Sequence, residues 1–310
     1  HQIDDAAEFG DAELALRLVL AVAIVARLGL VAAFFRFFFD HADDAQRRTT
    51  FRTVFWTLQG TTLVWAAATA GTAHWLGPRV FATEPIAARL VLLGALGVYV
   101  SVNYELTSAL FRVQQRPVAY SVRTVVNLLS TAAFSILFLV VLDMGADGLL
   151  LGAYLGQLLV YAFVLVEQRS WLGLSLDRPL LRRMLDFGLP LMPAGAALWA
   201  VTLINRPVVR AVDGAAALGV LGAAFRIGTG VMLLVNAFQL AWPAFAYSLK
   251  DDGEARRTYA AVMTIYLAAM GWAAATLALL APWLVRLLTA EQYWDAKDAV
   301  LPIALAGPLY

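Results

Sequence analysis

Three arginines lie inside long apolar segments of the chain: Arg17, Arg27 and Arg226. A guanidinium group in hydrocarbon is unfavourable by roughly 2.5 to 3.5 kcal/mol on insertion scales, so such residues usually face a wet interior. Their planar N–H groups suit the bidentate binding of phosphate oxygens. We therefore interpret them as cations that line a cavity and hold an anionic group. The alternative for Arg17 and Arg226 is extension to the membrane interface.

Two further charged residues are candidates for the same chemistry. Glu105 is the one acid at a depth comparable with Arg27, so it is a candidate partner of that arginine and a candidate coupling-ion site. A surface ion pair with Arg112 is the alternative for Glu105. Arg206 closes the apolar segment that begins at Phe187, and it could meet an anionic substrate at the outer mouth or anchor to lipid headgroups.

The composition excludes most other classes of protein. The chain is 61% hydrophobic and 15% charged, with a mean hydropathy of +0.73, so it lacks the polar side chains that would cover a soluble domain. The net charge of +1 gives no basic field for nucleic acid. Cysteine is absent, the three histidines are scattered, and no Gly-rich phosphate loop occurs. We expect a polytopic membrane protein with no catalytic residues, no metal and no cofactor, and therefore not an enzyme.

The positioning elements are segments of membrane length, which predict an all-α bundle. An Asp-Gly turn is expected near residues 213–214, and Pro190 and Pro193 are expected in the first turns of their helix, where a missing N–H costs least. The predicted spans cover residues 14–35, 53–76, 88–111, 118–142, 148–166, from 187 onward, 215–248, 258–285 and from 299 onward.

The distribution of basic residues predicts the orientation of these spans. Loops 36–52, 112–123, 169–183 and 250–257 carry 14 of the 23 Lys and Arg residues. Because short cytoplasmic loops hold the excess of positive charge, loop 36–52 is expected in the cytoplasm and residue 1 on the opposite, periplasmic side.

A sequence echo at a spacing of 209 positions predicts an internal duplication. It places Arg17 opposite Arg226, and Arg27 opposite Asn236. The copies lie six predicted helices apart, so they share an orientation and form parallel repeats. We expect at least 12 spans in the complete protein, of which this chain lacks the first and the last two or three. The predicted division is an N-terminal lobe (1–168), a cytoplasmic linker (169–183) and a C-terminal lobe (184–310).

Several motifs carry a resemblance to a known family. These are FGLP at 187–190 followed by Pro-Ala at 193–194, LG-x6-R at 218–226, and AF-x2-AWP-x-FA at 237–246, with EFGDAELALR and FFRFFFDHADDAQRR in the front half. The chain resembles the bacterial oligosaccharide flippases, the polysaccharide biosynthesis (O-antigen type) family of the multidrug/oligosaccharidyl-lipid/polysaccharide (MOP) exporter superfamily. That family often has Asp-Arg where this chain has Asn205 and Arg206.

The resemblance implies a two-lobed, MATE-like bundle that alternates between inward-open and outward-open states. The cargo would be an oligosaccharide on a polyprenyl diphosphate, flipped across the bacterial inner membrane for lipopolysaccharide and other surface polysaccharides. Arg17, Arg27 and Arg226 would hold the diphosphate, and Asn103, Asn127 and Asn236 would meet sugar hydroxyls. The implied partners are the lipid bilayer, H⁺ or Na⁺ as coupling ion, and a polysaccharide polymerase with glycosyltransferases.

Three alternatives remain open at this stage. A drug or metabolite/cation antiporter of the same superfamily would need several intramembrane carboxylates, of which Glu105 is the one candidate. A membrane-embedded sugar polymerase or ligase would need a large outward loop. A non-transporting assembly factor would lack a hydrated central cleft.

Overall fold

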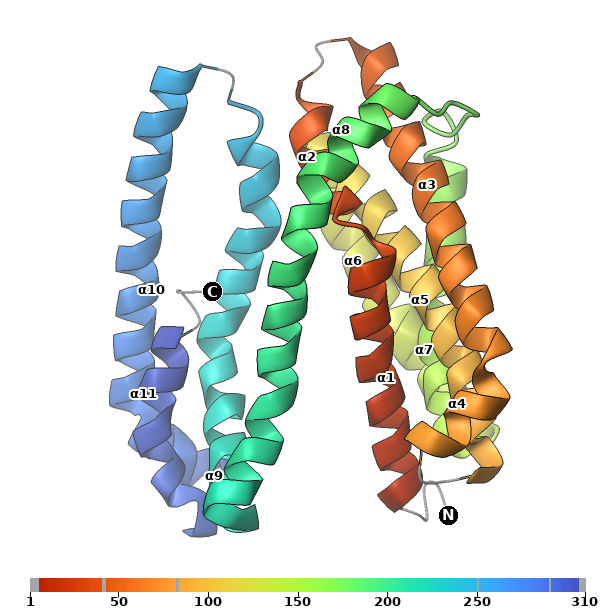
Figure 1. Cartoon of the computed structure of the whole chain (residues 1–310). Helices are drawn as coiled ribbons and strands as arrows, with labels where there is room; N and C mark the ends of the chain where they lie inside the picture. The colour runs from red at the N-terminus through yellow and green to blue at the C-terminus, as the bar shows by residue number, and fades with distance from the viewer. Residues whose placement is uncertain (1–5, 41–42, 82–83, 250, 290, 307–310) are drawn as a thin grey trace. The chain divides into compact units, whose positions relative to one another are not determined.

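The computed structural model of the chain describes residues 6–40, 43–81, 84–249, 251–289 and 291–306. These residues form helices, turns and bends, and none of them lies in a β-strand. The prediction of an all-α fold is therefore confirmed. The chain divides into two compact units, His1–Ala197 and Leu198–Tyr310, which are described separately below (Figure 1).

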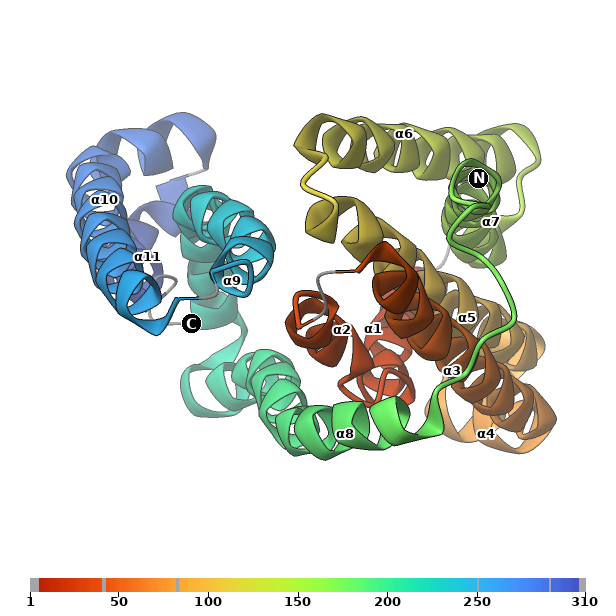
Figure 2. The ribbon, with the colours of Figure 1, turned by 90° about the horizontal axis from the view of Figure 1, so that it is seen from above.

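The first unit is built around α5, a 30-residue helix that packs against α1, α2, α3, α4, α6 and α7 (Figure 2). Apolar residues of α5 such as Leu90, Val98 and Leu106 are fully buried or nearly so. The elements of this unit are α1 (Ala6–Ala26), α2 (Leu30–Phe38), α3 (Asp44–Gly71), α4 (Ala73–Val80), α5 (Glu84–Val113), α6 (Pro117–Ile136), the π-helical turn η1 (Leu137–Val141), α7 (Gly145–Glu167), α8 (Arg178–Gly188), the 3-10 turn η2 (Leu189–Leu191) and the start of α9 (Met192–Ala246).

Helix α6 packs mainly against α7 and exposes apolar residues such as Leu128 and Leu129. Glycines of α7 allow the two helices to approach closely. A Cβ atom on Gly152 would lie 2.5 Å from the backbone of Ser135, and one on Gly156 would lie 2.7 Å from that of Thr131. Small residues at such an interface let helix backbones meet where no hydrophobic force drives association.

Four helices of the described residues are long and apolar enough to cross a membrane: Ile86–Val113, Pro117–Val141, Gly145–Glu167 and Gly253–Leu288. Two bent pairs, Asp11–Ala26 with Leu30–Phe38 and Val220–Gly228 with Gly230–Ala246, pass the same test of length and composition. The chain is thus a multi-pass membrane protein, as predicted.

The first predicted span, residues 14–35, is divided between two helices. The chain breaks after Ala26, and α1 and α2 are bent by 50° relative to each other. Leu28 and Gly29 adopt positive φ values of 51° and 66° at the break. Glycine has no Cβ atom to oppose this conformation, and it commonly ends helices in this way.

The prediction that a helix begins at Phe187 is wrong. Phe187 lies near the end of α8, a short amphipathic helix that buries Leu180 and Met184 and exposes its arginines. The 3-10 turn η2 follows and contains Pro190, and α9 then begins with Pro193 in its first turn. Proline is tolerated at both places because the first N–H groups of a helix have no helical partner.

The second unit contains most of α9, then α10 (Asp252–Leu288), the 3-10 turn η3 (Glu291–Ala296) and α11 (Lys297–Ala306). Helical hydrogen bonding continues through residues 213–214, where the sequence predicts a turn, and the chain reverses by a sharp bend within α9 (Figure 1). Val231 and Val235 of α9 pack with Ala274 of α10 and Ala304 of α11.

Candidate functional site

The break between α1 and α2 carries a partly buried ion pair in the first unit. Nη2 of Arg27 lies 2.8 Å from Oε2 of Glu105 on α5, and the two side chains are 27% and 34% exposed. The structure therefore brings together the two charged residues that the sequence places at a comparable depth. Nε of Arg27 is buried and has no hydrogen-bond partner among the described residues, so the guanidinium group keeps an unused donor.

A side chain of α3 stabilises the broken end of α1. The hydroxyl of Thr61 donates a hydrogen bond of 3.0 Å to the carbonyl oxygen of Ala26. The last carbonyl groups of a helix have no helical partner and need another donor, particularly inside a membrane. Thr61 supplies one at the residue that precedes Arg27, so the break is a supported structural feature.

Buried polar side chains also join α3, α5 and α7. The amide of Gln59 donates to the hydroxyl of Tyr161 at 2.6 Å and accepts from the hydroxyl of Tyr99 at 2.8 Å. The amide of Asn103 donates to the Thr62 hydroxyl at 2.9 Å. Each of these bonds links two helices, and buried hydrogen bonds between side chains of this kind fix the register of the helices.

The fully buried Asn103 lies inside the packing of α3 and α5. Its Oδ1 atom has no hydrogen-bond partner among the described residues. Asn127 lies on α6, with a buried Oδ1 that likewise has no partner there. Because α6 packs chiefly against α7, the structure does not bring Asn127 to the ion pair between α1 and α5.

Arg17 lies on α1, ten residues before Arg27, and Arg27 directly follows the end of this helix. The separation corresponds to about 15 Å along the helix axis. It pairs with Glu13 one turn earlier, and its side chain is 30% exposed. The spacing of these two residues, i and i+4, is the favourable one for an ion pair on a helix surface. Sequence reasoning considered Arg17 alone, although this spacing was visible.

The second unit carries the remaining predicted site residues on α9. Arg226 and Asn236 are both exposed in this unit. Arg206 belongs to α9 by its backbone, but it lies outside the residues whose side chains the structure describes. Among the described residues no group of three His, Asp or Glu side chains is arranged to hold a metal ion.

Sequence reasoning missed a set of donors on α3 that hold the segment after α7. Arg48 donates to the carbonyl of Ser170 at 3.2 Å, Arg52 to that of Trp171 at 3.0 Å, and Trp56 to that of Gly173 at 2.8 Å. The three donors are spaced four residues apart, so they lie on one face of α3. We call residues 170–177 the strap. The four-residue spacing of these donors was visible in the sequence. Their acceptors are backbone carbonyl groups, however, and the sequence does not show which carbonyl groups accept.

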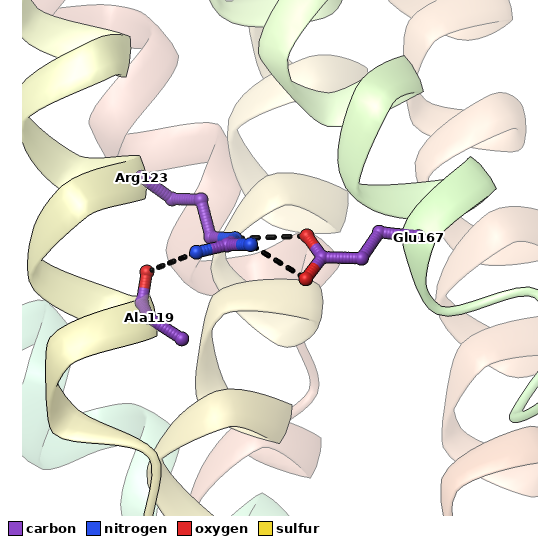
Figure 3. A network of polar contacts seen from close by, with 3 residues as sticks. All are labelled: Ala119, Arg123 and Glu167. Carbon is purple, nitrogen blue, oxygen red and sulfur yellow. Dashed lines mark hydrogen bonds and ion pairs between the residues drawn. The ribbon is translucent and has the colours of Figure 1, made fainter.

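A bidentate ion pair fastens α6 to the end of α7 (Figure 3). Nε and Nη2 of Arg123 lie 2.9 Å and 2.5 Å from the two carboxylate oxygens of Glu167, and Nη1 donates to the carbonyl of Ala119 at 2.9 Å. The guanidinium group also lies 4.9 Å from the ring centre of Phe111. These contacts join the side chain of Arg123 to α5, α6 and α7.

Solved structures share this fold. The chain resembles the structure described as "Crystal structure of MATE P26A mutant" with a TM-score of 0.75 and 15% identity over 98% of this chain and 71% of that one. It also resembles the structure described as "Crystal structure of MATE in the straight conformation", with a TM-score of 0.70 and 16% identity over 98% of this chain and 70% of that one. A third similar structure is described as "Outward-facing conformation of a multidrug resistance MATE family transporter of the MOP superfamily". Its TM-score is 0.72 and its sequence identity is 15%, and the match covers 99% of this chain and 71% of that one.

These likenesses define the class: the chain has the fold of MATE-type transporters of the MOP superfamily. The family model described as "Polysaccharide biosynthesis protein" matches residues 5–298. The chain therefore belongs to that family, and the resemblance inferred from its motifs is confirmed. No curated protein is similar enough in sequence to match the chain. One of the structural neighbours is described as a multidrug resistance transporter.

Proposed function

We propose that the protein flips an oligosaccharide carried on a polyprenyl diphosphate from the cytoplasmic to the periplasmic leaflet by alternating access. Membership of a polysaccharide biosynthesis family and the fold of MOP transporters support this proposal. A sugar diphosphate needs a polar, cationic environment to cross hydrocarbon. The protein acts in this proposal as a transporter, without catalytic residues or a cofactor.

The observation that carries the proposal is the ion pair of Arg27 and Glu105 at the break of a membrane helix. Broken helices commonly mark the substrate and ion sites of transporters, because their ends present unpaired backbone and charge. Arg27 retains a donor that no described residue uses. A phosphate group can take up this donor and compete with Glu105 for the rest of the guanidinium group.

Arg17 is a further proposed phosphate ligand in the first unit, and Arg226 is the proposed phosphate ligand of the second unit. Both occupy equivalent positions of the sequence duplication and lie on helices with apolar flanks. Asn236 is the proposed contact for sugar hydroxyls, with Arg206 at the outer mouth. Asn103 is fully buried between α3 and α5, and α6 does not bring Asn127 to the ion pair, so these two residues are not part of the proposed site. The lobes of this proposal are residues 1–168 and 184–310, joined by the linker at 169–183.

Glu105 is the proposed coupling site. When a diphosphate draws Arg27 away, the carboxylate loses its cationic partner. An unpaired carboxylate within a membrane helix is unfavourable, so it binds H⁺ or Na⁺ in exchange. The exchange links cargo binding to ion uptake at one pair of side chains.

The proposed setting is the bacterial inner membrane, with loop 36–52 in the cytoplasm and residue 1 on the periplasmic side. The basic residues gathered in loops 36–52, 112–123, 169–183 and 250–257 support this orientation. In a pathway for lipopolysaccharide or another surface polysaccharide, glycosyltransferases would supply the cargo and a polymerase would receive it.

The test is a translocation assay with the complete protein in liposomes, in which a membrane-impermeant glycosidase reports lipid-linked oligosaccharide that has reached the far leaflet. Arg27→Gln is expected to lower the rate at least about tenfold, because it removes charged hydrogen bonds to the diphosphate. Arg79→Gln is the matched control, since Arg79 is an exposed arginine that stacks on Trp75. Wild-type translocation by Arg27→Gln at equal protein amounts would refute the proposal.

A further inference from the structure

The contact between α2 and α8 contains two arginines and two phenylalanines in a crossed arrangement. The guanidinium carbon of Arg36 on α2 lies 5.5 Å from the ring centre of Phe187 on α8. That of Arg183 on α8 lies 5.4 Å from the ring centre of Phe37 on α2. Each helix thus supplies one cation and one ring, and both distances fall within the range of cation–π contacts.

The two rings of this arrangement fix its geometry. Phe37 and Phe187 meet edge to face, with their centres 6.2 Å apart and their planes at 81°. Phe37 is buried, and Phe187 is half-buried. The approach of α2 to α8 is close because Gly29 and Gly188 meet backbone to backbone at the other end of α2, where a Cβ atom on Gly29 would lie 2.1 Å from the Gly188 oxygen.

Both guanidinium groups keep their N–H edges free. Arg36 and Arg183 are exposed, and neither forms an ion pair or a hydrogen bond with any residue in the described part of the chain. Asp186 and Asp40 are the nearest acids along the two helices, and no ion pair joins them to these arginines. The ring contact uses the flat face of the guanidinium group, so the donors at its edge remain available to a ligand.

The position of α8 indicates where such a ligand would come from. This helix is amphipathic, with Leu180 and Met184 buried and Arg178, Arg182 and Arg183 exposed. It leads through η2 into α9, and α2 leads toward α3, at the end of the unit where α5 and α7 also finish (Figure 1). A helix of this pattern is typical of the boundary between water and lipid headgroups.

We propose that Arg36 and Arg183 form a clamp for a phosphate group of an anionic membrane lipid. Each guanidinium group is a planar donor that suits phosphate oxygens, and its contact with a ring restricts its orientation before the ligand arrives. Attraction of anionic lipids to basic residues near a membrane is general, but the crossed stacking assigns binding to two particular arginines on this face. This clamp is separate from the proposed cargo site at Arg27, so either can fail without the other.

The test uses the complete chain in detergent and measures bound lipid by native mass spectrometry. Phosphatidylglycerol is the probe, and zwitterionic phosphatidylethanolamine is the reference lipid. Arg36→Gln or Arg183→Gln is expected to weaken phosphatidylglycerol binding by about tenfold, and Arg182→Gln by less than about twofold. Arg182 is the matched control because it is an exposed arginine of α8, the same helix as Arg183, and contacts no aromatic ring among the described residues.

A second pair of variants separates the clamp from a loss of folding. Arg36→Lys and Arg183→Lys keep the charge but lose the planar fork, so we expect both to bind phosphatidylglycerol several-fold more weakly than the wild type. An equal loss in Arg182→Gln, or wild-type binding by all four variants, would overturn the clamp. Inorganic diphosphate that binds at Arg36 and Arg183 as tightly as phosphatidylglycerol would overturn the assignment to a lipid.

Discussion

The indole N–H of Trp56 donates a hydrogen bond of 2.8 Å to the carbonyl oxygen of Gly173, and the two residues are 117 positions apart in the chain. This bond is one of those by which side chains of α3 hold the strap. A further bond joins the two segments, because the backbone amide of Asp177 donates to the Thr53 hydroxyl at 3.0 Å. The segment between α7 and α8 is therefore ordered by side chains of a helix formed much earlier in the sequence.

Replacing Trp56 by Phe should loosen the strap. The variant keeps an aromatic ring but loses one hydrogen bond, which corresponds to about 1 kcal/mol. We expect trypsin to cleave after the exposed Arg169 about fivefold faster, because cleavage follows the free energy of local opening. Trp75→Phe is the control, since Trp75 is 60% exposed. Equal cleavage rates in the two variants would show that the bond does not restrain the strap.

The break between α1 and α2 should not tolerate a side chain at position 29. Gly29→Ala introduces a Cβ atom 2.1 Å from the oxygen of Gly188 and imposes a φ of 66° on alanine. We expect the free energy of unfolding to fall by about 2 kcal/mol or more, measured by thermal unfolding in detergent. Gly60→Ala serves as the control because a Cβ atom there meets nothing within 4 Å, so its stability should hold or rise.

The pair of Arg123 and Glu167 should show energetic coupling. The side chains are only 19% and 24% exposed, and the pair is bidentate, so it is less screened than a surface pair. In a double-mutant cycle of Arg123→Gln and Glu167→Gln, we expect a coupling energy of about 1 to 2 kcal/mol. A value near zero, from the same unfolding measurement, would mean that helix packing holds α6 without a contribution from this ion pair.

Exchanging the charges of Arg27 and Glu105 should separate their structural role from their function. Arg27→Glu and Glu105→Arg each place two like charges where an ion pair stands at 2.8 Å, so each single variant should accumulate poorly. The double variant restores opposite charges and should recover much of the folded protein. Translocation should stay lost, because the cation no longer lies at the end of α1. A double variant that transports normally would argue against Arg27 as a cargo ligand.

Most helices of the fold could be predicted from apolar length alone. The segments predicted at 88–111, 148–166 and 258–285 correspond to α5, α7 and α10. Their ends differ by a few residues, because capping residues such as Asp251 extend helices into polar sequence. Hydropathy does not report backbone torsion, so it could not show that Leu28 and Gly29 adopt positive φ inside an apolar run.

The candidate site was predictable only where its chemistry is rare. Arg27 and Glu105 could be predicted because a charge is unfavourable inside an apolar segment. Acids at that depth are scarce, so Glu105 was the candidate partner of Arg27. Gln59, Tyr99 and Tyr161 did not stand out, since polar uncharged residues are common in membrane helices. Their hydrogen bonds depend on which faces of α3, α5 and α7 meet, and that is a property of packing.

The bend after Ala26 couples the shape of α1 to the charge balance of α5. If α1 and α2 were to join into a straight rod, Leu28 and Gly29 would have to rotate out of their left-handed torsions, and Thr61 would lose its acceptor as the ladder of helical bonds closed over Ala26. The same rotation would carry Arg27 around the axis and withdraw it from Glu105. Straightening would therefore remove from Glu105 the guanidinium group that lies 2.8 Å away, so a change in the shape of α1 would alter the balance of charge on α5.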